Sequence, residues 1–389
     1  MREMDKTIKV CNVAEEGRFG GPQRRITQVA VALQNHNVDT HVVYPVMDSE
    51  VFAQNLKQGG VKCTSLNITR LTKERKVLIR YALRFLWEIW VLSSFFKKNH
   101  FDIIHANGSY QFKVAIAAKL SGIPLVWHLN DTMMSSLVYR AFKATQGFCA
   151  KGFIVAGQRV FDYYLDNSEI KGRPFSEINA PVDTEKFSPS GNEVNLDSEK
   201  LTVVSLSGIN PTKGVEYFVR MAACIHKVYP QVRFKVAGAE LRSHQIYSNM
   251  VKELVTELRV EDYIEFHGLV DDVVKFLDSA DICVFTSISE ASPTAIWEAM
   301  SMGKAVVTTD VGSVNKYIGN GVSGDIVPVK DVDALCDRTL KLIDNQELRD
   351  GYGQVAREVA EKELDVKAVA KKHKEIYERI IKHAAGEQS

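Results

Sequence analysis

Two glutamates spaced eight residues apart carry the clearest chemical signal in the sequence. Glu290 lies in a short polar loop that follows an apolar run at residues 282–286. Glu298 lies in a helical pattern that opens with Ser292-Pro293 and stops at Gly303. Ser is a preferred N-cap and Pro is tolerated at the first helical position, so we predict a helix that starts at this pair. Helical side chains lean toward the N-terminus, which directs the Glu298 carboxylate back toward the loop.

The predicted junction between the Glu290 loop and the helix that follows it combines an anion site with two carboxylates. The free N–H groups after Pro293 and the positive end of the helix dipole suit a phosphate group. The carboxylates of Glu290 and Glu298 suit ligand hydroxyls. A nucleotide sugar offers a diphosphate and hydroxyls together. The alternative is a solvated helix with two unrelated glutamates, because pairs at this spacing also occur by chance.

A second candidate anion site follows the first predicted strand, at residues 8–14. Gly20-Gly21 stands before a helix that begins near Pro22. Glycines let the backbone approach a ligand closely, and the helix N-terminus favours an anion. Three arginines are expected to add positive charge there: Arg18, Arg24 and Arg25. A tight turn with a solvated basic rim is the alternative.

Three further polar residues follow predicted strands. Lys213 belongs to the loop Asn-Pro-Thr-Lys-Gly at residues 210–214, and it either neutralises a phosphate or is an exposed loop lysine. His105 and His128 each end a strand. A histidine there can polarise a substrate hydroxyl, although a hydrogen-bonded core histidine is the more frequent case. No histidine–acid group or D-x-D motif indicates a metal site, so we predict none.

Apolar runs alternate with helical patterns along most of the chain, which predicts right-handed parallel α/β sheets. Residues 176–200 interrupt this alternation with Ser, Pro, Asn and charged residues, and therefore predict a linker. We expect two α/β domains in tandem with a cleft between them. The expected parts are an N-terminal domain at 1–182, a linker at 183–199, a C-terminal domain at 200–364 and an amphipathic helix near 365–384.

The composition excludes several classes of protein. The chain has 389 residues, a net charge of +1 and 25% charged residues, which argues against nucleic-acid binding as its main role. No apolar run reaches eighteen residues, and the N-terminus enters a strand without a signal peptide. Six cysteines without a C-x-x-C pair predict reduced thiols in a cytoplasmic protein.

Taken together, these segments resemble the retaining glycosyltransferases of family 4, the group 1 glycosyltransferases, which have the GT-B fold. The resemblance implies two Rossmann-like domains with parallel sheets that face a central cleft, and a C-terminal helix at 365–389 that packs back on the first domain. The matching segments are Gly20-Gly21, residues 102–108 (DIIHANG), 123–131 (IPLVWHLND), 178–189 (INAPVDTEKFSP), 210–214 (NPTKG), 266–272 (FHGLVDD), Glu290 and residues 298–318.

The resemblance also implies roles for single residues. Glu298 would hold the ribose hydroxyls, and Glu290 would hold the hydroxyls of the donor sugar. Lys213 would stabilise the leaving diphosphate, and His128 would lie near the sugar. The other implied substrate-binding positions are Gly20 and Gly21 near the phosphates, Gly208 and Asn210 before the lysine, Leu269 and Val270 near the base, and Ser292, Pro293, Thr294 and Ala295 near phosphate and sugar.

Three places depart from the family pattern, and one of them is the linker, which has Ala180-Pro181 where the family has Gly-Val. Most members have an arginine five residues before the lysine, where this chain has Gly208. Diphosphate stabilisation must then depend on Lys213, backbone dipoles, or a residue such as Arg18 or Arg24. The loop after the first glutamate reads Ala-Ser-Pro at 291–293 rather than Gly-Phe-Gly, which leaves the donor sugar open.

We therefore expect a metal-independent, retaining glycosyltransferase of the hexosyltransferase type that needs no cofactor. Its partners would be a nucleotide-sugar donor, expected to be UDP-linked, and a glycan or lipid-linked acceptor in polysaccharide or glycolipid biosynthesis. Two alternatives stay open: a sugar-nucleotide epimerase with the same fold, and an inactive nucleotide-sugar-binding subunit.

Residues 70–98 predict a basic helix with bulky apolar side chains. They hold eight basic residues, among them Lys73, against two acids. Such a helix can lie in the interface of an anionic bilayer, at the inner face of the membrane. A helix that covers the sheet would instead bury the same Leu and Trp side chains. We expect a buried apolar face with an exposed basic part at residues 70–84, and peripheral membrane contact as the hypothesis to test.

Overall fold

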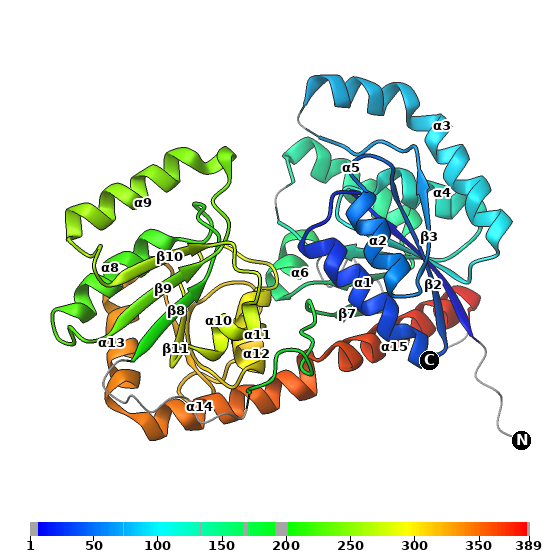
Figure 1. Ribbon diagram of the computed structural model, residues 1–389. Coiled ribbons are helices and arrows are strands. Elements are labelled where there is room, and N and C mark those ends of the chain that lie inside the picture. The colour runs from blue at the N-terminus through cyan, green and yellow to red at the C-terminus, as the bar shows by residue number, and fades with distance from the viewer. Residues whose placement is uncertain are drawn as a thin grey trace, which may run out of the picture. The chain divides into compact units, whose positions relative to one another are not determined.

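The computed structural model describes residues 7–72, 74–132, 134–165, 170, 172–190 and 201–386, and it divides into two units. The N-terminal unit comprises the chain up to Pro181 together with the segment from Val366 onward. The C-terminal unit runs from Val182 to Asp365. Each unit contains its own parallel sheet (Figure 1). The prediction of two Rossmann-like domains is therefore confirmed. Much of the predicted linker, residues 191–199, and Lys73 lie outside the described residues.

The N-terminal unit is built on a seven-stranded sheet with the order β3-β2-β1-β4-β5-β6-β7. The strand order reverses between β1 and β4, and ligands of such sheets bind at the carboxyl ends of the strands beside this reversal. Both β4 and β5 are buried along their whole length, as expected for central parallel strands. The strands are β1 Ile8–Ala14, β2 Val38–Pro45, β3 Lys62–Leu66, β4 Ile103–Asn107, β5 Leu125–Leu129, β6 Gly152–Val155 and β7 Phe175–Glu177.

Seven α-helices accompany this sheet in the described residues, and the last one comes from the far end of the chain. Its residues Ile376 and Ile380 share a core with Val10 and Val126 of the sheet. Gly152 permits this packing, because a Cβ there would overlap the Ile380 side chain. The helices are α1 Gly21–Leu33, α2 Glu50–Gln58, α3 Arg75–Asn99, α4 Phe112–Ser121, α5 Ser136–Cys149, α6 Gln158–Tyr164 and α15 Val366–Ala385.

Helix α3 does not bury its apolar side chains as expected. Leu83, Leu86 and Trp90 are 82%, 79% and 66% exposed. The helix is held instead by a narrow inner stripe that includes Leu92 and Phe96. This stripe alone covers the neighbouring core, so the bulky side chains on the other faces remain in solvent.

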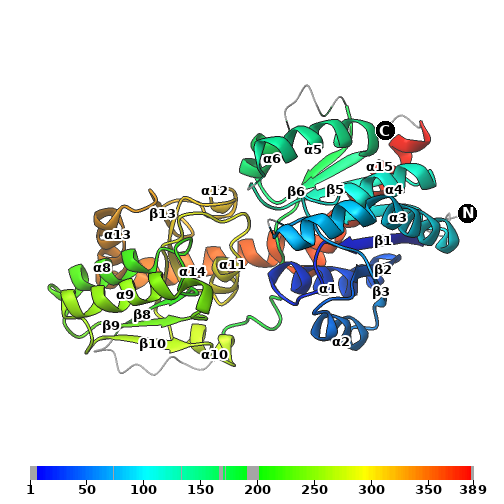
Figure 2. The same cartoon turned by 90° about the horizontal axis from the view of Figure 1, so that it is seen from above.

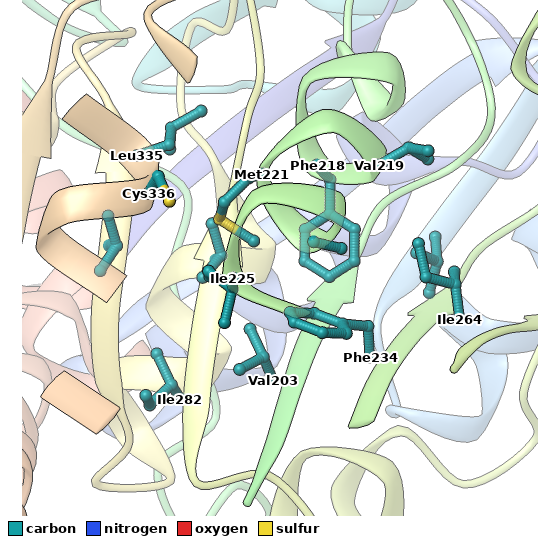
Figure 3. Close-up of a cluster of buried hydrophobic side chains, with 14 of the residues drawn as sticks. Val203, Phe218, Val219, Met221, Ile225, Phe234, Ile264, Ile282, Leu335 and Cys336 are labelled. Atoms are coloured by element: carbon teal, nitrogen blue, oxygen red, sulfur yellow. The ribbon is translucent and has the colours of Figure 1, made fainter. Parts of the chain in front are cut away.

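The C-terminal unit has a six-stranded parallel sheet with the order β10-β9-β8-β11-β12-β13. One face is packed by Phe218, Met221 and Ile225 of α8 against Phe234 and Ile282 of the sheet (Figure 3). The strand order reverses between β8 and β11. The strands are β8 Thr202–Leu206, β9 Arg233–Ala237, β10 Ile264–Gly268, β11 Ile282–Phe285, β12 Ala305–Thr309 and β13 Asp325–Val327.

The other face of this sheet is covered by a second core. Trp297 and Met300 of α11 pack there with Phe285 of the sheet and Ala356 of α14. Each sheet is thus flanked by helices of its own unit, as the view from above also shows (Figure 2). The α-helices are α8 Val215–His226, α9 Gln245–Leu258, α10 Val273–Asp278, α11 Thr294–Ser301, α12 Val314–Tyr317, α13 Val332–Asp344 and α14 Gln346–Val359.

Cys224 and Cys336 form a disulfide that joins α8 to α13. The prediction of six reduced thiols is wrong for this pair. The two helices pack side by side and bring the Cα atoms within 6.6 Å, although 112 residues separate them in sequence. The spacing of cysteines along the sequence cannot predict a disulfide between residues so far apart. Among the described residues, no helix is both long and apolar enough to cross a bilayer.

Candidate active site

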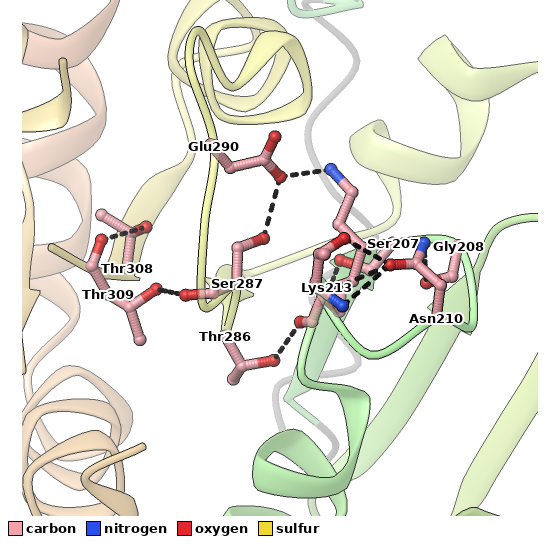
Figure 4. A network of polar contacts seen from close by, with 11 residues as sticks. Ser207, Gly208, Asn210, Lys213, Thr286, Ser287, Glu290, Thr308 and Thr309 are labelled. Carbon is pink, nitrogen blue, oxygen red and sulfur yellow. Dashed lines mark hydrogen bonds and ion pairs between the residues drawn. The ribbon is translucent and has the colours of Figure 1, made fainter. Parts of the chain in front are cut away.

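The polar loop after β11 brings Glu290 to Lys213, a residue from the loop after β8. The Lys213 ammonium forms an ion pair with Oε1 of Glu290, and the same oxygen accepts a 3.0 Å hydrogen bond from the Ser287 hydroxyl (Figure 4). The Lys213 and Glu290 side chains are 28% and 16% exposed. Two residues predicted separately as phosphate and sugar contacts therefore meet at the carboxyl ends of neighbouring strands.

The loop that carries Lys213 is held by its own side chains. The side-chain Oδ1 of Asn210 accepts the backbone N–H of Thr212 at 3.0 Å and that of Lys213 at 3.2 Å. Gly214 has a φ of +60° and lies against the carbonyl of Thr286, the residue after β11, so a Cβ at this position would collide with that carbonyl. The Thr286 hydroxyl also donates a 2.8 Å hydrogen bond to the Gly214 carbonyl. Asn210 and Gly214 therefore position Lys213 instead of leaving it on a free loop.

Helix α11 starts one residue later than predicted. Pro293 is the N-cap, with its carbonyl accepting the N–H groups of Ile296 at 3.0 Å and Trp297 at 3.3 Å, so the prediction of Ser292 as the cap is wrong. The Ser292 hydroxyl instead accepts a 3.3 Å hydrogen bond from the Trp297 indole. The predicted end is confirmed, because Gly303 follows the helix with a φ of +64°.

The residues at the start of α11 differ in their exposure. Thr294 is exposed, and Ala295 and Glu298 are partly buried. Glu298 lies in the second turn of the helix, as expected. The eight residues of α11 thus present free N–H groups and one carboxylate at the same end of a buried strand, β11.

The positions expected near the diphosphate and the base differ in accessibility. Gly208 packs tightly, since a Cβ there would lie 3.3 Å from the Ala239 carbonyl oxygen. This close approach lets the next residue, Ile209, donate a 3.0 Å hydrogen bond to Ala239. After β10, Leu269 is 79% exposed, whereas Val270 packs against the core beside α11.

In the N-terminal unit, Gly20 caps α1 and Gly21 is its first residue. Both glycines are exposed, but Arg25 does not add charge to their turn. Its guanidinium is buried, donates a 2.8 Å hydrogen bond to Asn107 Oδ1 and lies 3.0 Å from Nε2 of His128. Arg25 lies on the inward face of α1, so the prediction that it adds positive charge at the turn is wrong.

His128 belongs to the interior of the same unit. Its side chain is fully buried, and its Nδ1 lies 3.0 Å from Nε2 of His105, which in turn lies 2.7 Å from the Tyr377 hydroxyl through Nδ1. Burial, with Arg25 next to it, holds the pKa of His128 well below its usual value. His128 is therefore a hydrogen-bonded core residue rather than one that could touch a substrate, because no surface of the ring reaches solvent.

A cavity of about 280 Å³ lies beside the glycine turn, within the N-terminal unit. It is lined by Glu15, Asn107 and Asn130, which follow or end strands β1, β4 and β5, and by residues of the turn itself. Glu15 and Asn130 were missed in the sequence. Their position directly after apolar runs was the available signal, and Asn130 also lies in the family-like segment at residues 123–131.

The chain has two Rossmann-like domains with parallel sheets. In the second domain, the Lys213 ammonium and the N-terminus of α11 lie beside the reversal of strand order. This combination is typical of GT-B glycosyltransferases. The family model described as glycosyl transferases group 1 matches residues 189–359, and glycosyltransferase family 4 matches residues 19–186. The chain belongs to the group 1 glycosyltransferases of the family 4 type, and it is a glycosyltransferase.

Two curated relatives and a solved structure are similar over almost the whole chain. An α-1,3-galactosyltransferase of Escherichia coli, named for UDP-Gal and α-D-GlcNAc-diphosphoundecaprenol, is 24% identical over 90% of this chain and 91% of its own. A diphospho-undecaprenol α-1,3-N-acetylgalactosaminyltransferase of Campylobacter jejuni is 22% identical over 88% and 92%. HepE of Anabaena, crystallised with UDP, has a TM-score of 0.80 and 20% identity, and the match covers 95% of this chain and 99% of HepE.

Proposed function

We propose that this protein is a retaining glycosyltransferase that moves a sugar from a UDP-sugar to a hydroxyl of a lipid-linked acceptor in glycolipid or polysaccharide biosynthesis. The observation that carries the proposal is the Lys213–Glu290 pair beside the N-terminus of α11. UDP as the donor is supported by the name of the Escherichia coli relative, and a diphospholipid acceptor is supported by the names of both the Escherichia coli and Campylobacter jejuni relatives. The UDP bound to HepE agrees with this choice of nucleotide.

The charge of each residue decides which part of the donor it would contact. Lys213 and the N-terminal N–H groups of α11 would face the diphosphate, while Glu290 and Glu298 would accept hydrogen bonds from sugar and ribose hydroxyls. Negative charge grows on the diphosphate as the glycosidic bond breaks, so a fixed cation there lowers the barrier. Without a donor, Lys213 and Glu290 satisfy one another; on binding, each would exchange its partner for a group of the ligand.

A donor panel tests the proposal. The full chain is incubated with UDP- and GDP-sugars, with and without a short-chain alkyl diphospho-N-acetylglucosamine, and the released nucleotide is measured. Acceptor-dependent release of UDP, with a product of the same anomeric configuration as the donor, is the expected result. Isomerisation of the donor without acceptor would support the epimerase, and nucleotide binding without turnover would support an inactive subunit.

We also infer that α3 attaches the enzyme to the cytoplasmic face of an anionic membrane. Leu83, Leu86, Trp87 and Trp90 recur at helical spacing and are exposed. The same helix carries four basic residues in its first ten: Arg75, Lys76, Arg80 and Arg84. Apolar side chains that insert into the headgroup region, flanked by cations, are typical of interfacial helices, and each basic residue near the surface contributes about 1 kcal/mol.

Vesicle flotation tests this attachment. The wild-type protein is expected to float with anionic vesicles at low salt and less at high salt, and to stay unbound with neutral vesicles. Replacing Leu83, Leu86 and Trp90 together by Gln should abolish flotation. Ile246→Gln, at an equally exposed apolar position of the C-terminal unit, is the matched control. Equal recovery of the triple variant and the wild type would exclude α3 as the attachment site.

A further inference from the structure

Arg25 holds the side chain of Asn107 in one orientation. The guanidinium Nη2 donates a 2.8 Å hydrogen bond to Asn107 Oδ1, and the two residues are only 7% and 4% exposed. Burial lowers the pKa of Arg25 to about 10, so the group remains a cation at neutral pH and can only donate hydrogen bonds. A reversed amide would place its NH₂ group against these donors. The oxygen of Asn107 therefore stays on the Arg25 side.

Two buried histidines fix Arg25 in turn. Nη1 of Arg25 lies 3.0 Å from Nε2 of His128. Nδ1 of His128 lies 3.0 Å from Nε2 of His105, whose Nδ1 lies 2.7 Å from the Tyr377 hydroxyl. Burial is the main reason that the pKa values of both histidines lie well below the ordinary value, so both rings are neutral at pH 7. A neutral His128 accepts from Arg25 through Nε2 and keeps its proton on Nδ1, which donates to His105. The guanidinium is thus held by a chain of contacts that ends on α15.

The amino group of Asn107 is left for the cavity of about 280 Å³ beside the glycine turn. Asn107 ends β4 and lines this cavity. Within the part of the chain that the structure describes, its side chain is held through Oδ1, and Nδ2 donates no hydrogen bond. A buried N–H donor without a protein partner suits an oxygen atom of a ligand.

Glu15 adds a carboxyl group to the lining of the same cavity. Its side chain lies against Gly108, where a Cβ would overlap Glu15 Oε2, and it accepts a hydrogen bond from the backbone N–H of Tyr110. Burial, followed by the negative charge of Asp131, raises the pKa of Glu15 to about 7. Near neutral pH this group can therefore accept a hydrogen bond from a ligand hydroxyl or donate one to it.

The remaining residues at the cavity suit a sugar ring better than a charged group. Arg18 Nε lies 2.9 Å from Glu16 Oε1, and Arg70 Nη1 lies 2.5 Å from Glu16 Oε2, so Glu16 already balances two cations. Phe19 and Ile26 supply apolar surface, which packs against the C–H faces of a sugar ring. The cavity thus offers one fixed N–H donor, a carboxyl group and apolar surface to a hydroxyl-bearing ring.

We propose that Asn107 donates a hydrogen bond to an oxygen on the sugar ring of the acceptor, and that Arg25 is the positioning residue that presents its amino group. The assignment rests on the proposed function and involves residues of the N-terminal unit alone. Arg25 acts through Asn107, by holding the amide oxygen. Without Arg25 the amide can rotate and present either atom to the ligand, so affinity for the acceptor falls.

Binding of the short-chain alkyl diphospho-N-acetylglucosamine, measured by calorimetry with and without UDP, tests both roles. Asn107→Asp keeps an oxygen against Arg25 but replaces the N–H donor by a second oxygen, so the Kd should rise at least about tenfold. Arg25→Met should raise the Kd about three- to tenfold, and Arg25→Lys should recover part of the loss. The controls Asn249→Asp and Arg220→Met, at exposed positions of α9 and α8, should bind as the wild type does.

Steady-state kinetics separates positioning from a purely structural role. Arg25→Met should raise the KM for the acceptor and leave the KM for the UDP-sugar unchanged. A loss of folded protein would instead lower kcat and leave both KM values as they are. If Asn107→Asp is impaired but Arg25→Met keeps the wild-type KM for the acceptor, Arg25 is not a positioning residue.

NMR of the Asn107 amide gives a readout that needs no turnover. In the full chain with ¹⁵N-labelled asparagine, one side-chain NH₂ pair should disappear in Asn107→Ser and should shift in the wild type when the alkyl diphospho-N-acetylglucosamine is added. An NH₂ pair that does not shift, or wild-type affinity in Asn107→Asp, overturns the inference, and the proposed function stands if sugar is still transferred. If the pair shifts but no nucleotide sugar is turned over, the proposed function fails and the binding role of Asn107 holds.

Discussion

Lys213 forms an ion pair with Glu290, although 77 positions separate the two residues in sequence. Among the described residues, no other contact between Lys213 and the loop that carries Glu290 is as short. Both side chains are partly exposed, and ion pairs of this kind contribute little to folding stability. The pair matters because each partner holds the other at the carboxyl ends of β8 and β11 before a donor arrives. Preorganised charge of this kind favours transition-state stabilisation.

Lys213→Ala is therefore expected to damage turnover more than donor binding. Losing one fixed transition-state contact raises the barrier by about 2.7–4 kcal/mol, or about 10²- to 10³-fold in kcat. Steady-state kinetics and calorimetry with UDP measure the two effects separately. Lys341→Ala, at an exposed position of α13, is the control that should behave as wild type. A raised KM with an unchanged kcat would assign Lys213 to ground-state binding alone.

Glu298→Ala should weaken binding of the free nucleotide. The loss of a charge-assisted pair of hydrogen bonds costs about 1.5–3 kcal/mol, or roughly ten- to hundredfold in Kd. Titration calorimetry with UDP measures this directly, and the exposed Glu347→Ala on α14 provides the control. An unchanged Kd would mean that Glu298 belongs to a solvated helix face and does not contact the nucleotide.

Much of the fold could be predicted because its signals are local. Parallel strands such as β8 and β11 appear as short apolar runs, and Gly303 ends α11 through a conformation that glycine favours. The start of α11 was misplaced by one residue, because Ser292 has the better cap chemistry but its hydroxyl is taken by the Trp297 indole. The local pattern could not reveal a partner that appears only after folding.

The candidate site was harder to predict because burial decides which polar residues can act. Arg25 and His128 look like functional residues in sequence, yet they satisfy one another in the core. Glu15 has no motif, and its properties come from Gly108 and Asp131, residues more than ninety positions away. Lys213 and Glu290 were identified one by one, and only the tertiary structure shows that they are paired.

The Cys224–Cys336 disulfide should stabilise the C-terminal unit. It links residues 112 positions apart, and closing a loop of that length removes about 4–5 kcal/mol of chain entropy from the unfolded state. Urea unfolding of the wild type with and without reductant should show this difference. The double variant Cys224→Ser/Cys336→Ser should be insensitive to reductant. Equal midpoints for the wild type in both conditions would mean that the bond does not constrain unfolding.

Glu15 should make the protein less stable as the pH rises through 7. Its pKa in the folded chain is about 7, against an ordinary value of 4.5, so between these values the folded state binds more protons than the unfolded state. Stability then falls with rising pH across this window, since ionisation of the enclosed carboxyl group is unfavourable. The difference in pKa corresponds to a loss of about 3 kcal/mol above pH 7, and none of it is felt below pH 4.5.

Glu15→Gln removes this loss, because the amide stays neutral and its oxygen can still accept the Tyr110 N–H. The variant should match the wild type near pH 4.5 and exceed it in free energy of unfolding by up to about 3 kcal/mol at pH 8. Urea unfolding at the two pH values measures both quantities, and the control Glu50→Gln, at an exposed position of α2, should show no such pH-dependent gain. A Glu15→Gln protein that is less stable than the wild type at pH 8 would instead make Glu15 a structural residue of the β1–β4 junction.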